Sequence, residues 1–338
     1  MKKLKAAVVG TGWVSGEHMA AYKVNPNTEL AAVCARRKES AEAKLKEYGY
    51  SARIYTDYEK MLKEEEIDIV SVCTPNHLHA EQTLIAAGHK KHVLIEKPVA
   101  LKEKDLDDML KVIRENRVKT LVSFVLHWNP LLMMIDNLLK DDAIGDIYYG
   151  EVDYYHGIGP WYKQYLWNVK KEIGVSSLLT AGCHAVDALL WFVNSKPVEV
   201  FSYSTRCSSP DYKEYEYDPT SVTMVRFENG TIGKVTSSVD CKTPYIFNIG
   251  LFGSKGTIRN NKLFSHKLSG QTGFAEIPTI LPDSGDVRHH PFEGEINHLV
   301  DCILNNKKPF PDIEDAAVVH RVVFAADLSA KEGKPVKL

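Results

Sequence analysis

The sequence predicts an α/β protein in which a doubly wound parallel sheet precedes a second, α+β domain with an open, mostly antiparallel sheet. Two observations support this prediction. Up to residue 122, short apolar runs alternate with helical stretches, and a glycine-rich turn follows the first run. From residue 123 onward, strand-like runs follow one another with short turns between them. Strands that alternate with helices are typical of parallel sheets, whereas consecutive strands favour antiparallel pairing.

Length and composition limit the classes of protein to consider. The 338 residues exceed what one core usually supports, so we expect two domains, residues 1–122 and 123–338. With 25% charged residues and a net charge of -2, the chain gives no general attraction for nucleic acid or a membrane surface. Its six cysteines form no CxxC pair, so we expect neither a metal site nor a disulfide framework, and we expect a cytoplasmic location. No run approaches 18 apolar residues, so no membrane span is predicted.

The first strand, expected over residues 4–9, leads directly into a glycine turn and a helix over 17–24. The turn contains Gly10, Thr11, Gly12, Trp13 and Val14, followed by Ser15 and Gly16. Backbone N–H groups at such a turn, with the dipole of the next helix, can hold a pyrophosphate. Ser15 takes the third glycine position of the usual fingerprint. A plain glycine turn is the alternative, but the position at the start of a strand–helix–strand unit favours dinucleotide binding.

The second strand, expected over residues 29–34, ends in Ala35, Arg36 and Arg37. An acidic residue at this position would accept hydrogen bonds from the adenosine ribose of NAD. Alanine removes that carboxylate, and either arginine can bind a 2′-phosphate with its planar fork. The sequence therefore predicts that NADP is preferred over NAD. The alternative is that both arginines are solvated residues at the start of a helix.

The same alternation continues through the first half of the chain. We expect helices over residues 39–48, 58–63, 79–87 and 104–116, and strands over 53–55, 67–72, 92–95 and 120–124. The strand over 67–72 opens into Cys73-Thr74-Pro75-Asn76, close to His79. The strand over 92–95 ends abruptly in Glu96-Lys97-Pro98.

Lys97 is the strongest candidate for chemistry in the first half. The apolar run before it delivers Lys97 to the carboxyl edge of the sheet, where ligands of open α/β sheets bind. Pro98 biases Lys97 towards an extended backbone, so that the ammonium group projects from a fixed stem. A lysine in this position can hold a substrate oxygen and exchange a proton with it. The alternative is an ordinary lysine at the end of a strand.

The second half combines strands and helices without regular alternation. We expect strands over residues 147–155, 197–205, 220–227, 231–239 and 245–252, and helices over 130–139, 177–192, 292–304 and 313–331. On a helix over 177–192, Thr180, His184 and Asp187 fall on one face, which is polar at its start. By itself, His184 would be interpreted as a core histidine with satisfied hydrogen bonds.

These motifs together resemble the glucose-fructose oxidoreductase and inositol dehydrogenase family, often called Gfo/Idh/MocA. The resemblance covers nearly the whole chain, with specific motifs at the glycine turn, at Cys73-Thr74-Pro75-Asn76, at Glu96-Lys97-Pro98, at Gly145-Asp146-Ile147 and at Ala181-Gly182-Cys183-His184. It implies a Rossmann domain followed by a sheet domain, and hydride transfer between a nicotinamide and a secondary alcohol of a sugar or cyclitol. It also implies a homodimer or homotetramer formed through the open sheet.

The resemblance implies roles for individual residues as well. Lys97 and His184 are the expected catalytic residues, and Thr74, Pro75, Asn76, His79, Glu96 and Lys97 are expected to bind the cofactor. The family commonly has an aspartate four residues before the histidine, where this chain has Thr180. We therefore expect Lys97 to carry a larger share of the proton handling, with Thr180 contributing a neutral hydrogen bond at most.

Aromatic and polar residues in the second half suit a carbohydrate ligand. The expected substrate contacts, beside Lys97, Thr180 and His184, are Trp128, Tyr155, His156 and Trp161. Sugars present flat C–H faces and rims of hydroxyl groups, which aromatic side chains and nearby donors can bind. The alternative for each aromatic residue is a place in the core, although Trp161 follows a loop-like Gly157-Ile158-Gly159-Pro160 stretch.

Three functions fit this pattern. The first is an NAD(P)-dependent dehydrogenase that acts on a sugar, glycoside or cyclitol, for example at C3 of a pyranoside. The second is a glycosidase that uses NAD in a transient oxidation, and the third is a non-catalytic sensor that binds a dinucleotide. Lys97 and His184 favour an enzyme, because a sensor has no need of a proton-transfer pair.

Overall fold

The structure, a computed structural model, describes residues 3–282 and 290–338. Its contacts divide the described chain into two units, residues 3–125 with 290–317 and residues 126–282 with 318–338. The expected boundary at residue 122 lies close to the first division. Residues 290–317, expected in the second domain, belong to the first unit, because their helix packs against a helix of that unit. Amphipathicity predicts a helix but does not determine which sheet it covers.

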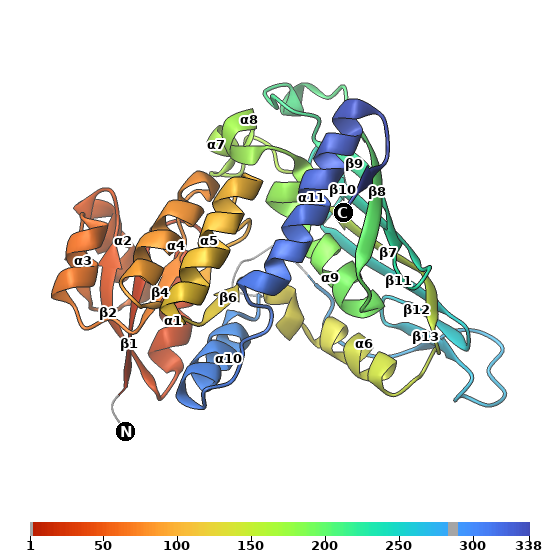
Figure 1. The fold of residues 1–338 in the computed structure, drawn as a ribbon, viewed down its shortest axis with the longest axis horizontal. Coiled ribbons are helices and arrows are strands. Elements are labelled where there is room, and N and C mark those ends of the chain that lie inside the picture. Colours follow the sequence, from red (N-terminus) through yellow and green to blue (C-terminus); the bar gives the residue numbers. More distant parts are fainter. Residues whose placement is uncertain (1–2, 283–289) are drawn as a thin grey trace. The chain divides into compact units, whose positions relative to one another are not determined.

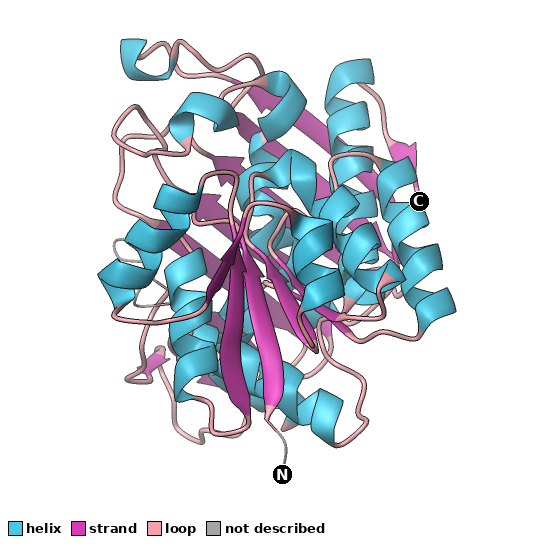
Figure 2. Ribbon diagram, turned by 90° about the vertical axis from the view of Figure 1, so that its left-hand side faces the viewer, coloured by secondary structure: helices cyan, strands magenta, loops and turns pink. Residues whose placement is uncertain are grey.

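The first unit is built on a parallel sheet with the strand order β3-β2-β1-β4-β5-β6. Its strands are β1 (Leu4–Val9), β2 (Thr28–Cys34), β3 (Arg53–Tyr55), β4 (Ile69–Val72), β5 (His92–Ile95) and β6 (Thr120–Val122). The central strands are almost continuously buried, as expected for a parallel sheet covered by helices on both faces (Figure 2). The strand order reverses between β1 and β4, and ligands of such sheets bind at the carboxyl ends of the strands beside this reversal.

Helices connect these strands and cover the sheet. They are α1 (Ser15–Val24), α2 (Lys38–Tyr48), α3 (Tyr58–Glu64), α4 (His79–Gly88) and α5 (Glu103–Asn116), joined by α10 (Phe292–Leu304) from the late part of the chain. Helix α4 packs against α5, while α1 packs against α2 and α10. Figure 1 shows α4 and α5 side by side, and α10 beside α1. The predicted doubly wound parallel sheet is confirmed.

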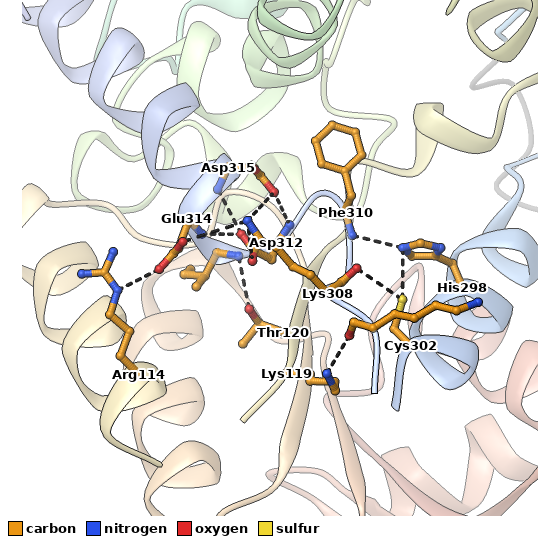
Figure 3. Close-up of polar contacts among 12 residues, drawn as sticks. Arg114, Lys119, Thr120, His298, Cys302, Lys308, Phe310, Asp312, Glu314 and Asp315 are labelled. Carbon is orange, nitrogen blue, oxygen red and sulfur yellow. Dashed lines mark hydrogen bonds and ion pairs between the residues drawn. The ribbon is translucent and has the colours of Figure 1, made fainter. Parts of the chain in front are cut away.

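The segment before α11 (Ile313–Glu332) covers the β6 edge of the parallel sheet. Val122 donates its backbone N–H to the carbonyl oxygen of Pro311 at 2.9 Å. Asp312 accepts the backbone N–H of Asp315, and Asp315 accepts that of Asp312 (Figure 3). This reciprocal cap satisfies free N–H groups at the start of α11. The bond from Val122 to Pro311 leaves less of the β6 edge unpaired.

The second unit contains a nine-stranded sheet with the order β14-β13-β12-β11-β7-β10-β9-β8-β15. Its strands are β7 (Ile147–Tyr155), β8 (Pro197–Thr205), β9 (Thr220–Phe227), β10 (Ile232–Ser238), β11 (Ile246–Gly253), β12 (Gly256–Arg259), β13 (Lys262–Ser265), β14 (Ala275–Glu276) and β15 (Val336–Lys337). All neighbouring pairs are antiparallel except β7 and β10, which run parallel. The predicted mostly antiparallel sheet is confirmed. The last four strands were not predicted, because they are too short for clear alternation.

The helices of the second unit lie on one face of this sheet. They are α6 (Pro130–Lys140), two single turns α7 (Tyr165–Asn168) and α8 (Lys171–Gly174), a π-helix (Leu178–Gly182), α9 (Cys183–Val193) and the greater part of α11. A side chain added at Gly150 or Gly233 would meet Leu189 within 3.0 Å, so these strand glycines let α9 approach the sheet closely. The stretch Lys171–Val193 is long and apolar enough to cross a membrane, but 78% of its apolar window is buried inside the protein.

The structure corrects one predicted element. Residues 177–192 were expected to form one α-helix, whereas a π-helix occupies Leu178–Gly182 before α9 begins. A side chain added at Gly182 would lie 2.6 Å from Cβ of Ser237 in β10, so close contact with the sheet accompanies the wider helical turn. Thr180 therefore lies in the π-helix, and His184 lies in the first turn of α9.

Candidate active site

The glycine turn lies directly after β1 and is shaped for a close backbone approach. Gly10 has φ +97°, and a side chain added there would lie 2.4 Å from the carbonyl oxygen of Cys73 after β4. Only glycine fits this conformation and this space. Trp13 is partly exposed and meets the ring of His290 edge-on. The turn therefore lies at the strand reversal between β1 and β4, directly before α1.

Ser15 and Gly16 have different roles at the start of α1. Ser15, in the third fingerprint position, is buried and donates to the carbonyl oxygen of Gly12 at 2.9 Å. Gly16 is the residue without room for a side chain, because an added Cβ would lie 2.2 Å from the ring of Tyr48 in α2. Ser15 thus stabilises the turn, and Gly16 permits the helices to meet.

Arg36 and Arg37 follow β2 at the same edge of the sheet, after the buried Ala35. Both arginines are exposed, and within the described residues neither forms an ion pair or a side-chain hydrogen bond. Their guanidinium groups are therefore available for an anionic ligand. No carboxylate stands at the end of β2.

His79 lies beneath the loops that follow β4 and β5. Its Nδ1 atom is 2.7 Å from the carbonyl oxygen of Pro98, and its Nε2 atom is 2.7 Å from that of Thr74. Burial holds the pKa of His79 below its ordinary value, although both carbonyl groups and Glu96 favour the protonated ring. His79 is a buried link between two loops, and its expected contact with the cofactor stays a prediction.

In the loop after β4, one further candidate is half-buried and another is buried. Thr74 donates its hydroxyl hydrogen to Oε1 of Gln82 at 2.7 Å. Asn76 is buried within a single 3₁₀ turn, and Pro75 precedes it in an extended conformation. These residues lie at the carboxyl end of β4, next to the strand reversal, as predicted.

Lys97 and Glu96 follow β5 and have opposite surroundings. Lys97 is half-buried, whereas Glu96 is buried with its carboxylate turned into the unit. Nε2 of His18 in α1 donates to Oε1 of Glu96 at 3.0 Å. Burial alone would raise the pKa of Glu96, but His18, Lys97 and a hydrogen bond from Ser123 hold it below its ordinary value. The carboxylate of Glu96 thus has partners in His18 and Ser123, and its expected contact with the cofactor stays a prediction.

In the second unit, His184 and Thr180 have separate partners. His184 is buried in the first turn of α9, and its ring stacks near that of Tyr154 with 6.5 Å between centroids. Thr180 lies in the π-helix and donates to Oδ1 of Asn168 at 2.7 Å. A threonine–asparagine pair of neutral groups thus stands where an aspartate is common among the proteins that this chain resembles.

The predicted helix places Asp187 on the same face as His184. The structure pairs it with another histidine, because Oδ2 of Asp187 lies 2.8 Å from Nε2 of His127. Both side chains are buried, and Trp191 stacks on the His127 ring with 4.1 Å between centroids. Burial raises the pKa of Asp187 above its ordinary value, although His127 acts in the opposite direction.

A hydrogen-bonded chain of aromatic residues lies at the end of β7. His156 bonds through Nδ1 to the Tyr154 hydroxyl at 3.2 Å and through Nε2 to the Tyr162 hydroxyl at 2.6 Å. Tyr245 meets the rings of Tyr154 and His156 edge-on. These four residues form the tyrosine–histidine cluster. Through Tyr154 the cluster also reaches His184.

The other expected substrate residues are distributed around this cluster. Trp161 is 60% exposed, so it is not a core residue, and its ring meets that of Tyr212 edge-on. Trp128 is half-buried beside His127. Tyr155 points to the opposite face of the sheet from Tyr154, because successive strand residues alternate. The structure therefore brings His156 and His184 to one face and separates Tyr155 from them.

Sequence reasoning assigned no individual role to four buried polar residues: His18, His127, Asn168 and Glu295. Of these, Glu295 had a detectable signal. It lies three residues after Phe292 and four before Leu299, so it falls on the apolar face of an amphipathic helix. An acid on a buried face indicates a special environment. The pairings of the other three join segments far apart in the chain, and local sequence does not encode them.

A parallel sheet with this strand order and a glycine turn beside the β1–β4 reversal is the arrangement of dinucleotide-binding proteins. The model of the Gfo/Idh/MocA oxidoreductase family with an NAD-binding Rossmann fold matches residues 4–124, and that of the GFO/IDH/MocA C-terminal domain matches residues 133–259. The chain belongs to this family. Its predicted family, its Rossmann fold and its class as an oxidoreductase enzyme are thereby confirmed.

Individual relatives are similar over nearly their whole length. D-glucoside 3-dehydrogenase of Escherichia coli (strain K12) is 26% identical, with 99% of this chain and 97% of that protein covered. The scyllo-inositol 2-dehydrogenase (NAD(+)) of Bacillus subtilis (strain 168) is 23% identical, with coverage of 99% and 96%. The crystal structure of an oxidoreductase domain protein from Kribbella flavida has the same fold, with a TM-score of 0.87 at 22% identity and coverage of 100% and 99%.

Proposed function

We propose that this protein is an NAD(P)-dependent dehydrogenase that acts on a secondary hydroxyl group of a sugar, glycoside or cyclitol. One observation carries the proposal most directly: the glycine turn after β1 and Lys97 after β5 lie at the same carboxyl edge of the parallel sheet. The relatives named above are dehydrogenases of a glucoside and of an inositol, which supports a carbohydrate or cyclitol as the substrate. We expect a pyranose ring or a cyclitol ring, oxidised for example at C3.

The first unit contains the residues that would hold the cofactor. Gly10, Thr11, Gly12, Trp13 and Val14 would bind the pyrophosphate, because Gly10 leaves no room for a side chain against Cys73 and no side chain caps the start of α1. Thr74, Pro75 and Asn76 would lie beside the nicotinamide, and His79 and Glu96 would support that region from beneath. When bound, the nicotinamide supplies the acceptor or donor of the hydride.

Lys97 and His184 are the proposed catalytic residues. In the oxidation direction, the hydroxyl group loses its proton as the hydride leaves, and histidine is the side chain best suited to accept a proton near neutral pH. We propose that Lys97 donates a hydrogen bond to the reacting oxygen, which stabilises the developing negative charge. His184 accepts or relays the proton, while Thr180 with Asn168 provides a neutral hydrogen-bonding group.

The proposed substrate contacts come from the second unit. His156 and Trp161 are the strongest of these, because His156 belongs to the tyrosine–histidine cluster and Trp161 presents an exposed ring. Trp128 is half-buried and offers a second aromatic surface. Tyr155 remains a proposed contact only for a ligand or subunit on the opposite face of the sheet.

We propose further that NADP is preferred over NAD. Arg36 and Arg37 are exposed, without ion pairs among the described residues, and follow a strand that ends without a carboxylate. Replacing both arginines by alanine should raise the Michaelis constant for NADP by about 10- to 100-fold, since hydrogen bonds to a charged group contribute about 1.5–3 kcal/mol. The constant for NAD should change little. Equal effects on both cofactors would contradict the preference.

A homodimer or homotetramer through the open sheet face is also proposed. On the face away from α9, Tyr203 and Phe201 of β8 lie opposite Val222 and Met224 of β9, and three of these four are clearly exposed. Exposed apolar rows of this kind often mark subunit interfaces. We propose a cytoplasmic location as well, because all six cysteines are free thiols.

The proposed function is tested by identifying the cofactor and the reaction together. Mass spectrometry of small molecules released from the purified protein identifies any bound dinucleotide. A panel of cyclitols, hexoses and glycosides is then followed by the absorbance of the reduced nicotinamide. Net reduction of the cofactor with a ring polyol is the expected result, and activity confined to acyclic hydroxy acids would contradict it. Glycoside hydrolysis without net reduction would indicate the glycosidase instead, and a bound dinucleotide with no turnover would indicate a sensor.

A further inference from the structure

Five polar side chains of the first unit meet behind Lys97, where the strands β4, β5 and β6 end. The buried acid cluster consists of His18 from α1, Ser71 from β4, Glu96 after β5, Ser123 after β6 and Glu295 from α10. All five are at least nine-tenths buried. The bonds that join them are His18 Nδ1 to Ser71 Oγ at 3.2 Å, His18 Nε2 to Glu96 Oε1 at 3.0 Å, and Ser123 Oγ to Glu295 Oε2 at 3.2 Å.

The two carboxyl groups in this cluster are not equivalent. Glu96 has a ring N–H from His18, a hydroxyl from Ser123 and the charge of Lys97, so its ionised form is well stabilised. Glu295 is completely buried, its Oε2 atom has only Ser123, and its Oε1 atom has no hydrogen-bond partner among the described residues. An ionised carboxylate with so few donors is strongly destabilised in the interior.

The charges around Glu96 and Glu295 favour different protonation states for the two acids. Burial and the negative charge of Glu96 raise the pKa of Glu295 well above its ordinary value, whereas the pKa of Glu96 is lowered. The other titratable groups that face the cluster are Tyr22 of α1, Cys73 after β4, His79 of α4 and Lys97. Burial raises the pKa of the Tyr22 hydroxyl and of the Cys73 thiol, so both are neutral.

We propose that Glu96 and Glu295 share one proton, held on Glu295, and that the single remaining negative charge on Glu96 is a positioning charge for the ammonium group of Lys97. The protonated Glu295 donates to Oγ of Ser123, and the Ser123 hydroxyl donates to Glu96. The second part of this proposal rests on the proposed role of Lys97 in the reaction. The location of the proton does not depend on it.

Infrared spectroscopy locates the proton without any assay of activity. At neutral pH, the difference spectrum between the wild-type protein and Glu295→Gln should contain the carbonyl band of a protonated carboxylic acid. The difference spectrum for Glu96→Gln should contain carboxylate bands instead. A carboxylate band lost in Glu295→Gln would overturn the proposal, and this variant removes no charge if the proposal is correct, so we expect it to fold.

The charge state of Lys97 is read by its reaction with acetic anhydride at a series of pH values, with the labelled peptide measured by mass spectrometry. Only the unprotonated amine reacts. In Glu96→Gln, Lys97 should be labelled at a lower pH than in the wild-type protein, because the variant removes a neighbouring negative charge that favours the ammonium form. Glu295→Gln, the matched amide variant, should leave the pH of labelling unchanged. Equal shifts in both variants would mean that both glutamates are ionised, which overturns the proposal.

The pH dependence of turnover connects the cluster to the reaction. The alkaline limb of kcat/KM should move to lower pH by about one unit in Glu96→Gln and stay in place in Glu295→Gln. Ser123→Ala, which removes one donor from Glu96, should move the limb in the same direction by less. If labelling shifts but the limb does not, Lys97 is not part of the rate-determining chemistry, and the proposed function of Lys97 fails while the shared proton stands.

Discussion

Each unit contains one buried histidine–carboxylate pair close to a proposed catalytic residue, and the two pairs behave differently. In the first unit, His18 bonds to Glu96, the residue before Lys97, at 3.0 Å. In the second unit, His127 bonds to Asp187, three residues after His184, at 2.8 Å. Although the bonds are alike, the pKa of Glu96 is lowered and that of Asp187 is raised. The bond to a histidine therefore does not by itself decide the charge of the acid.

The difference lies in what else reaches each carboxyl group. Burial raises the pKa of both acids, and for Asp187 only the charge and hydrogen bond of His127 oppose it. Glu96 also has the charge of Lys97 and the hydroxyl of Ser123. Each added donor or opposite charge favours the ionised form, and together they outweigh the loss of water. The first unit thus places a fixed negative charge beside Lys97.

The removal of the Lys97 ammonium group should have one of the two largest effects on turnover. Lys97→Ala should lower turnover by about 10²- to 10⁴-fold, because it removes the group that holds the reacting oxygen. Cofactor affinity, measured by fluorescence titration, should remain within a few-fold of the wild type. Lys102→Ala, an exposed lysine five positions later, is the control and should keep its activity. Near-normal turnover of Lys97→Ala would assign Lys97 to structure.

The removal of the His184 ring in the second unit should lower turnover to a similar extent, because it removes the proposed proton acceptor. His184→Ala should lower turnover by about 10²- to 10⁴-fold and should remove the limb of the pH profile that reports the general base. The exposed His266 offers a control, since His266→Ala removes a ring far from the proposed chemistry in sequence and in sheet position. If His184→Ala retained turnover with an intact pH profile, His184 would be a structural residue.

The ionised carboxyl groups of Glu96 and Asp187 should affect the stability of the fold with opposite signs. Glu96, with its lowered pKa, stabilises the fold above its unfolded value of 4.5, and this contribution is lost as the pH falls through its folded value. Glu96→Gln should therefore destabilise the protein at neutral pH by about 1–3 kcal/mol. Asp187, with its raised pKa, lowers stability as the pH rises from 3.8 through its folded value. Asp187→Asn should remove that decline.

Urea unfolding at several pH values measures both effects, and each variant is compared with the wild type at the same pH. A loss of stability at neutral pH in Glu96→Gln, together with a flatter pH dependence of stability in Asp187→Asn, would support the opposite effects of the two acids. The same sign and the same pH dependence in both variants would show that the two pairs are electrostatically equivalent.

The smallest effect is expected at Thr180. Its hydroxyl donates to Asn168, so Thr180→Ala removes one neutral hydrogen bond, which contributes about 0.5–1.5 kcal/mol. Turnover should fall by no more than several-fold, and the pH profile should keep its shape. Thr180→Asp tests the same position in the other direction, because a carboxylate there should move the limb assigned to His184 towards higher pH. An unchanged limb would mean that Thr180 does not influence the histidine.

Much of the fold could be predicted from the sequence because the signals are local. The alternation of strands and helices over residues 4–122 follows from the spacing of apolar residues, and β1, β3 and β7 have the predicted bounds. The glycine turn was recognisable because only glycine adopts the conformation of Gly10. Lys97 was recognisable because an apolar strand ends directly before it. Each of these features depends on residues adjacent in the chain.

By itself, then, the sequence determined the parallel sheet, the glycine turn and the positions of Lys97 and His184 on their elements. Tertiary structure decided the return of α10 to the first unit, the π-helix before α9, and the partners of Glu96, Asp187 and Thr180. Those partners come from segments far apart in the sequence, such as His18 with Glu96 and His127 with Asp187. The charge of a buried acid depends on how many donors reach it and how much water it loses, and both quantities exist only once the chain has folded.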